Sequence, residues 1–390
     1  EILFILMGMI DSSLDIQNKL LEWFRENGRH WIPWKLKSDG SIPDSGESIS
    51  PYEIWIAEVM LQQTQLKVVI PYWEKWMQIF PSLTDLAEAD LQKVLLVWQG
   101  LGYYSRANRI HQSSKILIEC VGFNRDQDPH SWPVGIDQWM SLPGIGRSTA
   151  GSIISSAFDL PAPILDGNVK RIFSRLLAIE STSSKGDKRL WELSSFLISN
   201  LSPRDFNQAL MDLGAKICTP KKPSCSVCPI QKFCVAYAKY DPHNFPKKEM
   251  NKINPLQEVG IGLVFNKNGE LLIDQRLESS SMGGMWEFPG GKKTSIESIE
   301  ETIEREIKEE LGIVVNVGKK LLTFDHTYSH KKINFTVHLC EWKSGEPKPL
   351  ASQKLLWVSP EKLVNFPFPA ANSKIISELY KLLGIEYKKL

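Results

Sequence analysis

Four cysteines lie close together and form the most distinctive chemical pattern of the chain. Cys218, Cys225, Cys228 and Cys234 follow the spacing C-x6-C-x2-C-x5-C. Soft thiolate ligands select zinc or iron–sulfur centres. A zinc site commonly pairs its cysteines as two C-x2-C units, and only Cys225 and Cys228 form such a unit here. The spacing therefore predicts a thiolate-bound metal centre and leaves both metals open.

Two acidic residues stand in settings that suit chemistry. Glu58 is the only ionisable residue of the apolar run Trp55–Leu61, which is predicted to be helical. Burial there raises the pKa of a carboxyl group, so Glu58 can stay protonated near neutral pH and act as a general acid. The alternative is a surface glutamate paired with a lysine. Asp166 precedes a helix predicted to begin near Val169, where it can serve as an N-cap.

A turn with two glycines joins two predicted helices in the segment L-P-G-I-G-R-S-T-A, residues 142–150. Gly144 and Gly146 permit backbone conformations that other residues avoid and leave room for close approach. Free N–H groups at the start of the second helix can hold a phosphate. A plain helix–helix turn is the alternative for this segment taken alone.

A third acidic group lies near the carboxyl end of the chain. Glu306, Glu309 and Glu310 are spaced to share one face of a helix predicted over Ile296–Leu311. Several carboxylates on one face can hold Mg²⁺ against a diphosphate. A solvated acidic helix is the alternative.

The elements that position these residues divide the chain into two predicted domains. Residues 11–240 are predicted to be mostly helical, and residues 256–390 to form an α+β domain. Residues 241–255 have the prolines and mixed charge of a linker. Strands are predicted at Val259–Phe265 and Leu271–Gln275 around an Asn-Gly turn, and at Ile333–Trp342. Helices are predicted at Leu14–Trp23, Tyr52–Phe80, Leu91–Leu101, Arg106–Cys120, Thr149–Phe158, Val169–Leu177 and Leu190–Leu201, with a surface loop at Lys35–Ser50.

Composition excludes several classes of protein. The net charge of +1 argues against a non-specific DNA coat protein, so any DNA contact has to come from local geometry. The apolar run near the amino terminus is too short to span a bilayer, and no membrane association is expected. A cytoplasmic location is expected, which argues against a disulfide framework. The two cysteines outside the cluster are predicted to be buried thiols, Cys120 and Cys340.

Five motifs occur in an order that resembles the MutY family of adenine DNA glycosylases. That family belongs to the helix-hairpin-helix (endonuclease III) superfamily and adds a C-terminal Nudix, or MutT-like, domain. The motifs are A-E-V-M-L-Q-Q-T-Q from residue 57, L-P-G-I-G-R-S-T-A from 142, I-L-D-G-N-V-K-R from 164, the cysteine run, and a complete Nudix box from Gly291 to Ile313.

The resemblance implies a base-excision reaction on double-stranded DNA that carries A:8-oxoguanine or A:G mispairs. Glu58 would protonate adenine at N7, and Asp166 would stabilise the oxocarbenium-like sugar. The target base is flipped out of the duplex. Ser148 stands where bifunctional relatives carry a nucleophilic lysine, which implies a monofunctional glycosylase. The DNA-contacting residues implied by the family motifs are Gln62, Gln63, Tyr103, Gly144, Gly146, Ser148 and Asn168.

The resemblance also implies a [4Fe–4S] cluster on the four cysteines. The lysines of this segment would then face the phosphate backbone; they are Lys216, Lys221, Lys222 and Lys232. A monomer is expected. A non-enzymatic alternative is a DNA-binding or redox module that uses the cluster only for sensing.

Two roles compete for the C-terminal domain. In the family this domain recognises 8-oxoguanine through a loop usually written F-S-H, and the sequence has Tyr328, Ser329 and His330 there. The complete Nudix box, with Glu306, Glu309 and Glu310 as a possible Mg²⁺ site, instead suggests an active nucleotide hydrolase. Recognition is favoured because both domains then serve one lesion.

Overall fold

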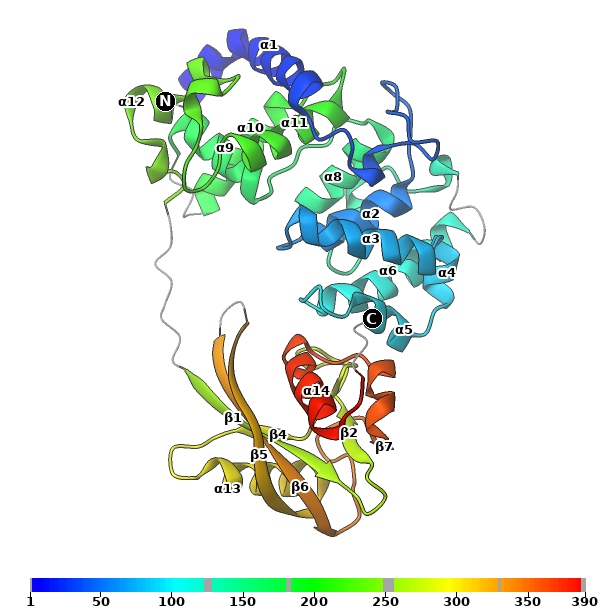
Figure 1. The fold of residues 1–390 in the computed structure, drawn as a ribbon. Coiled ribbons are helices and arrows are strands. Elements are labelled where there is room, and N and C mark those ends of the chain that lie inside the picture. Colours follow the sequence, from blue (N-terminus) through cyan, green and yellow to red (C-terminus); the bar gives the residue numbers. More distant parts are fainter. Residues whose placement is uncertain (1, 123–127, 180–183, 248–255, 329–330, 387–390) are drawn as a thin grey trace. The chain divides into compact units, whose positions relative to one another are not determined.

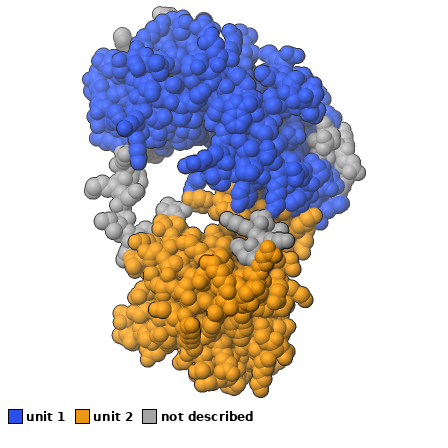
Figure 2. Space-filling model, in the orientation of Figure 1, with its two compact units in different colours: residues 1–88, 112–250 blue, residues 89–111, 251–390 orange. Residues whose placement is uncertain are grey.

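The computed structural model describes residues 2–122, 128–179, 184–247, 256–328 and 331–386. The chain divides into two compact units (Figure 2). Unit 1 contains residues 1–88 and 112–250, and unit 2 contains residues 89–111 and 251–390. Of the segment predicted as a linker, residues 248–255 lie outside the described residues, and residues 242–244 form a short 3-10 turn.

Unit 1 is built from helices, as the sequence predicts (Figure 1). The long predicted run Tyr52–Phe80 is two helices, because the chain turns at residues 62–65, where Gln63 has a φ of 59°. The helices are α1 (Ile2–Asn27), α2 (Pro51–Leu61), α3 (Leu66–Ile79), α4 (Leu83–Glu88), the end of α6 (Ser105–Val121), α7 (Ile136–Met140), α8 (Arg147–Phe158), α9 (Gly167–Leu177), α10 (Ser184–Leu197), α11 (Pro203–Lys216) and α12 (Val235–Lys239).

Four helices share one hydrophobic core in unit 1. Apolar residues of α1, α9, α10 and α11 pack together, and Ile230 from the cysteine segment joins them. Cys218, Cys228 and Cys234 pack against the edge of this core. Burial of this apolar surface therefore anchors the cysteine segment to α9 and α11.

Helix α2 is buried on nearly all sides. Ser50 caps its first turn by accepting a hydrogen bond from the Glu53 N–H, and Pro51 occupies the first helical position. The helix packs against α8 and against the short 3-10 turn η1 (Pro33–Lys35). A polar residue on α2 is consequently held among apolar neighbours, which is the setting predicted for Glu58.

The predicted surface loop at residues 35–50 has no long helix or strand, and the rest of unit 1 holds it in place. Gly46 N–H donates to the Asp159 carboxylate, and Ile49 N–H donates to the Ala157 carbonyl. Arg204 bonds the carbonyl oxygen of Glu47. The loop therefore packs on the carboxyl end of α8.

Unit 2 combines residues 89–111 with an α+β body. Helix α5 (Leu91–Trp98) and the start of α6 lie against the loop that precedes Trp286. Gln92 donates to the Gly284 carbonyl and accepts from Trp286 Nε1, both at 2.9 Å. Asn108 donates to the Gly283 carbonyl at 3.0 Å.

The sheet of unit 2 is mixed. Its main path runs β3-β2-β1-β6-β5, with β4 paired to β1 and β7 to β2. β1 and β6 are parallel, and the remaining neighbours along this path and the two side pairs are antiparallel. The predicted Asn-Gly turn joins β1 to β2, with Gly269 at a φ of 76°. The strands are β1 (Gln257–Phe265), β2 (Leu271–Gln275), β3 (Trp286–Glu287), β4 (Gly290–Lys292), β5 (Val314–Tyr328), β6 (Lys331–Ser344) and β7 (Lys354–Val358).

Both faces of this sheet are covered by helices (Figure 1). Leu271 and Ile273 pack with α14 (Ala370–Leu383), whereas Leu272 packs with α13 (Ile299–Leu311). This alternation follows from the two-residue period of a strand. Helix α13 is preceded by a capping box formed by Ser298 and Glu301, and Gly312 caps its carboxyl end. It begins three residues later than the predicted helix Ile296–Leu311.

The two cysteines outside the cluster differ in exposure. Cys340 is buried as predicted, but Cys120 is exposed, so its prediction was wrong: it lies on the solvent side of α6. The sequence predicts no membrane-spanning helix. In the described part of the chain, no helix combines the length and the apolar character that crossing a bilayer requires.

Candidate active site

Glu58 lies on α2 with its carboxyl group in a poorly solvated setting. Its pKa is raised to about 7; burial is the largest cause, and the negative charge of Asp166 also acts to raise it. The Ser152 hydroxyl of α8 and the positive charge of Lys35 act in the opposite direction. A carboxyl group with this pKa is largely protonated below neutral pH and can donate its proton to a bound base.

Asp166 is the N-cap of α9, as its local sequence predicts. Its Oδ1 accepts hydrogen bonds from the backbone N–H groups of Asn168 and Val169, at 3.1 and 2.8 Å. The Asn168 side chain donates to Oδ2 at 3.2 Å. Three donors therefore fix the carboxylate. Helix α8 packs against α2, the helix of Glu58, and its Ser148 accepts a hydrogen bond from the N–H of Leu165, the residue before Asp166, so the two predicted acidic residues border the same helix.

The glycine turn leads into α8, which also borders this site. Gly144 has a φ of 81°, and Gly146 is the N-cap of α8. A side chain added at Gly146 would meet no atom within 4 Å, so the turn is open on that side. The Ser148 hydroxyl accepts a hydrogen bond from the Leu165 N–H at 3.0 Å, which ties α8 to the segment that precedes Asp166.

The two glutamines that follow α2 differ in conformation. Gln62 donates to the Gly144 carbonyl and to the Thr149 hydroxyl, both at 3.4 Å, so it lies beside the glycine turn. Gln63 has a φ of 59°, in the left-handed region that residues other than glycine rarely adopt. Such backbone strain is concentrated at functional sites.

Tyr103 belongs to unit 2 and shares this unusual backbone conformation. Its φ is 49°, and its side chain is 42% exposed. Arg106 lies 5.4 Å from the Tyr103 ring and donates to the Gly102 carbonyl at 3.0 Å, while Trp98 donates to the same carbonyl. These contacts hold the loop that presents the tyrosine ring to solvent.

The four cysteines of the predicted metal centre lie along one loop beside α9. None of them forms a disulfide. Arg175 of α9 donates to Cys218 Sγ at 3.3 Å, and Cys234 Sγ contacts the Arg175 carbonyl at 3.4 Å. Cysteine thiolates are the ligands that iron–sulfur clusters take. By the chemistry of the donor set, four free thiols on one loop, the residues present fit an iron–sulfur cluster, although in the described chain their side chains are not gathered as the ligands of one ion.

A second arginine of α9 connects this loop to the candidate catalytic aspartate. Arg171 donates to the Cys218 and Gly214 carbonyls, both at 2.7 Å, and to Asn168 Oδ1 at 2.9 Å. Asn168 in turn holds Asp166. A continuous chain of hydrogen bonds thus runs from the cysteine loop to the carboxylate.

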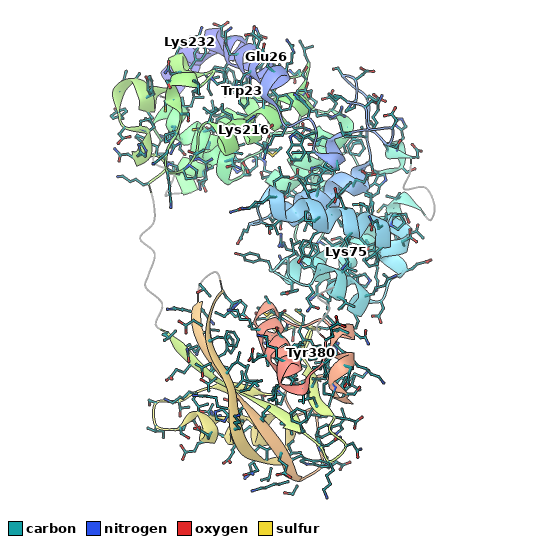
Figure 3. The ribbon with its side chains drawn as sticks, viewed as in Figure 1. Trp23, Glu26, Lys75, Lys216, Lys232 and Tyr380 are labelled. Atoms are coloured by element: carbon teal, nitrogen blue, oxygen red, sulfur yellow. The ribbon has the colours of Figure 1, made fainter. Side chains whose placement is uncertain are left out.

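Two of the four lysines expected to face phosphate contact α1 instead (Figure 3). Lys216 donates to the Asn27 carbonyl at 2.6 Å. Lys232 lies 3.8 Å from the Asp15 carboxylate in an exposed ion pair. An exposed ion pair is weak, so Lys232 can exchange Asp15 for a phosphate at little energetic cost.

The Nudix-box glutamates are held by different partners. Arg305 binds Glu306 at 3.0 Å and Glu309 at 3.1 Å, and the same arginine also binds Glu297. Burial raises the pKa of Glu310 to about 7. In the part of the chain that the structure describes, no three His, Cys, Asp or Glu side chains are gathered as the ligands of one metal ion.

The predicted 8-oxoguanine loop is only partly described. Ser329 and His330 lie outside the described residues. Tyr328 ends β5 and is partly buried, and its ring meets the His326 ring edge-on at 4.5 Å between centroids. The ring therefore lies at the end of β5, beside His326 and against the hydrophobic core of unit 2.

Sequence reasoning missed several residues of the site. Lys35, Arg29 and Asp212 form a charged group near Glu58, and Arg171 supports Asp166. Arg171 stands in the same short motif as Asp166, three residues after Asn168, and this spacing on a helix was the only available signal. The others come from distant segments, and no local pattern marks them.

Comparison with known proteins gives three family matches in the order of the motifs. Residues 56–195 match the HhH-GPD superfamily of base excision DNA repair proteins. Residues 218–234 match the iron–sulfur binding domain of endonuclease III. Residues 260–378 match the NUDIX domain. These matches confirm the predicted fold class, a helical glycosylase fold followed by a Nudix-like α+β domain.

Whole-length relatives cover most of the chain. An adenine DNA glycosylase of Buchnera aphidicola (subsp. Schizaphis graminum) is 35% identical over 82% of this chain and 84% of its own length. An adenine DNA glycosylase of Mus musculus is 31% identical over 92% of this chain and 76% of its own. Among solved structures, a thermostable thymine-DNA glycosylase aligns with 59% of this chain and 98% of its own, at 24% identity and a TM-score of 0.49.

Proposed function

This chain belongs to the adenine DNA glycosylase family, whose members act in base excision repair, and we propose that its substrate is adenine opposite 8-oxoguanine or guanine in double-stranded DNA. The observation that carries the proposal is the pairing of Glu58 with Asp166. One carboxyl group has its pKa raised to about 7, and the other is held as a hydrogen-bonded helix cap beside it.

Two carboxyl groups in different environments suit cleavage of a glycosidic bond. Adenine leaves readily only after protonation, and Glu58 supplies a proton to N7 of the extruded base. The C1′–N9 bond then breaks with its electrons going to the base, and Asp166 stabilises the positive charge on the sugar. Water adds to C1′, loses a proton and completes the hydrolysis.

Ser148 supports a monofunctional reaction. A lysine at this position would form a Schiff base with the sugar and lead to strand cleavage, which a serine hydroxyl cannot do. Here the hydroxyl also has a structural task, since it accepts the hydrogen bond from Leu165 N–H. The product is therefore an intact strand with an abasic site.

The glycine turn and its neighbours suit DNA binding. The backbone N–H groups at Gly144, Gly146 and Ser148 can hold a phosphate at the start of α8. Gln62 and Gln63 follow α2 next to this turn and can fill the gap left by the extruded base. Asn168 holds Asp166, and Tyr103 offers an exposed ring that can wedge beside the lesion.

The cysteine loop is proposed to hold a [4Fe–4S] cluster through Cys218, Cys225, Cys228 and Cys234. When bound, the cluster would supply a metal centre to which all four cysteines of the loop are tied. Arg175 and Arg171 connect the loop to α9, since both bond Cys218. Lys221 and Lys222 of the same loop are two further basic residues.

Unit 2 is proposed to recognise 8-oxoguanine through Tyr328, Ser329 and His330. Nucleotide hydrolysis with Mg²⁺ on Glu306, Glu309 and Glu310 is the competing function, favoured by the complete Nudix box. Recognition is favoured because both units then serve one lesion.

The test is single-turnover excision on duplexes that carry adenine opposite 8-oxoguanine, guanine or thymine, with abasic products revealed by alkali. We expect fast excision opposite 8-oxoguanine, slower excision opposite guanine and none opposite thymine. Glu58→Gln should lower the rate by at least about a hundredfold, the usual contribution of a general acid.

Glu74→Gln, at an exposed position of α3, is the matched control and should keep the wild-type rate. Excision by Glu58→Gln at the wild-type rate would refute the role of Glu58. Failure of iron-loaded wild-type protein to release adenine from any duplex would refute the proposed substrate.

A further inference from the structure

A short loop before β3 fastens residues 89–111 to the Nudix fold. In this loop, which consists of residues 282–285, Met282 has a φ of 59° and Gly284 a φ of 80°. A Cβ at Gly284 would lie 3.3 Å from Leu95 Cδ1, so the loop approaches α5 closely. A residue other than glycine rarely adopts a positive φ, and such strain is concentrated at functional positions. The reaction proposed for Glu58 and Asp166 gives no reason for it.

Amide side chains of α5 and α6 hold this loop through hydrogen bonds. Gln92 of α5 donates to the Gly284 carbonyl and accepts from Trp286 Nε1, both at 2.9 Å. Asn108 of α6 donates to the Gly283 carbonyl at 3.0 Å. All three bonds are partly buried, so removal of one partner leaves a poorly solvated polar group behind. Two helices are thus clamped on one loop of the Nudix fold.

The segment between α5 and α6 carries Tyr103 and is held by the same two helices. Trp98, the last residue of α5, donates from Nε1 to the Gly102 carbonyl at 3.0 Å. Arg106 of α6 donates to the same carbonyl at 3.0 Å, and its guanidinium lies 5.1 Å from the centre of the Trp98 ring. A shift of α5 or α6 on the Nudix fold would therefore also move Tyr103.

Trp286 continues this connection into the hydrophobic core of unit 2. Its buried ring meets the Phe366 ring edge-on, with 5.2 Å between centroids, and its backbone N–H donates to the Pro367 carbonyl at 2.9 Å. Tyr328 packs against the same core. Trp286 therefore reaches from the core that supports Tyr328 to Gln92 on α5.

We propose that Gln92 and Asn108 are positioning residues that couple the reading of the lesion by Tyr328 to the placement of Tyr103. When the Nudix fold binds 8-oxoguanine, residues 282–285 keep α5 and α6 in a fixed place on that fold, and the Tyr103 ring is presented beside the same lesion. With guanine opposite adenine, Tyr328 does not fix the fold on the base, and the clamp adds little. This inference rests on the proposed roles of Tyr328 and Tyr103.

The experiment is single-turnover adenine excision by the full chain with its iron, on A:8-oxoguanine and A:G duplexes. Gln92→Met keeps the length of the side chain and removes both of its hydrogen bonds. The loss of two neutral hydrogen bonds should slow excision opposite 8-oxoguanine by about tenfold and opposite guanine by less than about twofold. Gln112→Met, at an exposed position of α6, is the matched control and should keep both wild-type rates.

A double-mutant cycle separates coupling from damage to the fold. Tyr328→Ala removes the ring that reads the lesion, so Gln92→Met should slow excision opposite 8-oxoguanine by less than about twofold in that background. Asn108→Ala breaks the second clamp and should act in the same direction as Gln92→Met. Equal slowing on both duplexes, or an effect of Gln92→Met that is the same with and without the Tyr328 ring, would overturn the coupling.

Hydrogen exchange of the DNA-free protein tests the clamp without the reaction. Gln92→Met should speed amide exchange at residues 100–106 as well as at residues 282–286, because both segments lose the same support. Faster exchange at residues 282–286 alone would overturn the connection to Tyr103.

If Gln92→Met does not fold, Gln92→Glu takes its place, since it keeps an acceptor for Trp286 Nε1 and loses the donor to Gly284. Wild-type exchange at both segments in Gln92→Glu would overturn the clamp. Wild-type protein that releases no adenine would instead overturn the proposed function, whereas the exchange result would still decide whether the loop of residues 282–285 positions Tyr103.

Discussion

A carboxyl group that is to act as an acid near neutral pH has to be kept from water, and this placement affects the stability of the fold. Burial raises the pKa of Glu58 from 4.5 to about 7. Between these two values the folded chain holds a proton that the unfolded chain releases, so the free energy of unfolding falls as the pH rises. Above pH 7 the full penalty is present, at most about 3 kcal/mol.

Glu58→Gln should therefore stabilise the protein at high pH while it abolishes catalysis. We expect the variant to melt above the wild-type temperature at pH 8 and at a similar temperature at pH 4.5, with the difference growing between these limits. Thermal denaturation over this pH range measures it. Glu74→Gln, at an exposed site, should show no such growth, and a constant difference for Glu58→Gln would mean that Glu58 is not held protonated.

The predictability of single residues depended on how local their signal is. Glu58 was identified because it interrupts an apolar run, and Asp166 because it precedes a helix, and both properties lie within a few residues of sequence. Lys35 and Asp212 carry no such signal. They meet only because η1, α2 and α11 pack together, and the segments that hold them are far apart in the chain.

Helices α9 and α11 are the elements that connect the cysteine loop to the catalytic site. Arg171 projects from α9 and binds carbonyl oxygens of Gly214 at the end of α11 and of Cys218 at the start of the loop. Gly214 is needed here, since a Cβ at this position would lie 2.6 Å from Asn168 Cβ. The close approach of the two helices therefore lets one arginine reach both the loop and Asn168.

Arg171→Gln should weaken this connection. Each lost hydrogen bond to the guanidinium is worth about 1.5–3 kcal/mol, so both cluster retention and the placement of Asp166 should suffer. We expect a lower ratio of iron to protein and slower adenine excision, measured by iron assay and by single-turnover kinetics. Arg171→Lys should recover part of the iron but little of the rate, because an ammonium group cannot reproduce the planar set of donors. If Arg171→Gln kept the wild-type iron content and excision rate, the hydrogen bonds of Arg171 would not contribute to cluster retention or catalysis.

The elements themselves were predicted well where their periodicity is strong, and poorly where the backbone turns without a glycine or proline. The predicted helices and strands lie near elements of the structure, whereas α11, α14, β5 and β7 were not predicted. The break between α2 and α3 was missed because Gln63, a residue that ordinarily fits a helix, adopts a positive φ. Tyr103, between the predicted helices Leu91–Leu101 and Arg106–Cys120, also has a positive φ, so two of the residues expected to contact DNA have a backbone conformation that the sequence does not indicate.

At the scale of the whole molecule, the grouping of residues 89–111 with the Nudix fold is a feature that the sequence did not indicate. Gln92 bonds Gly284 and Trp286, which lie in a distant segment of the chain. Hydrogen bonds between distant segments produce no periodic pattern in the sequence. The segment that carries Tyr103 therefore shares a compact unit with the strand that carries Tyr328.

Lesion discrimination is the property that this unit should control. Tyr328→Ala removes a ring that can stack on 8-oxoguanine, and stacking of one base is worth about 1–3 kcal/mol. We expect the affinity for A:8-oxoguanine duplexes to fall by about tenfold, while the affinity for A:G duplexes changes little, so the preference between them shrinks. Binding is measured with Glu58→Gln as background, so that the substrate stays intact.

Tyr328→Phe keeps the ring and should keep the preference. An equal loss on both duplexes would show that Tyr328 supports the fold and does not read the lesion, and release of pyrophosphate from free nucleotides by the wild type with Mg²⁺ would assign this unit to hydrolysis.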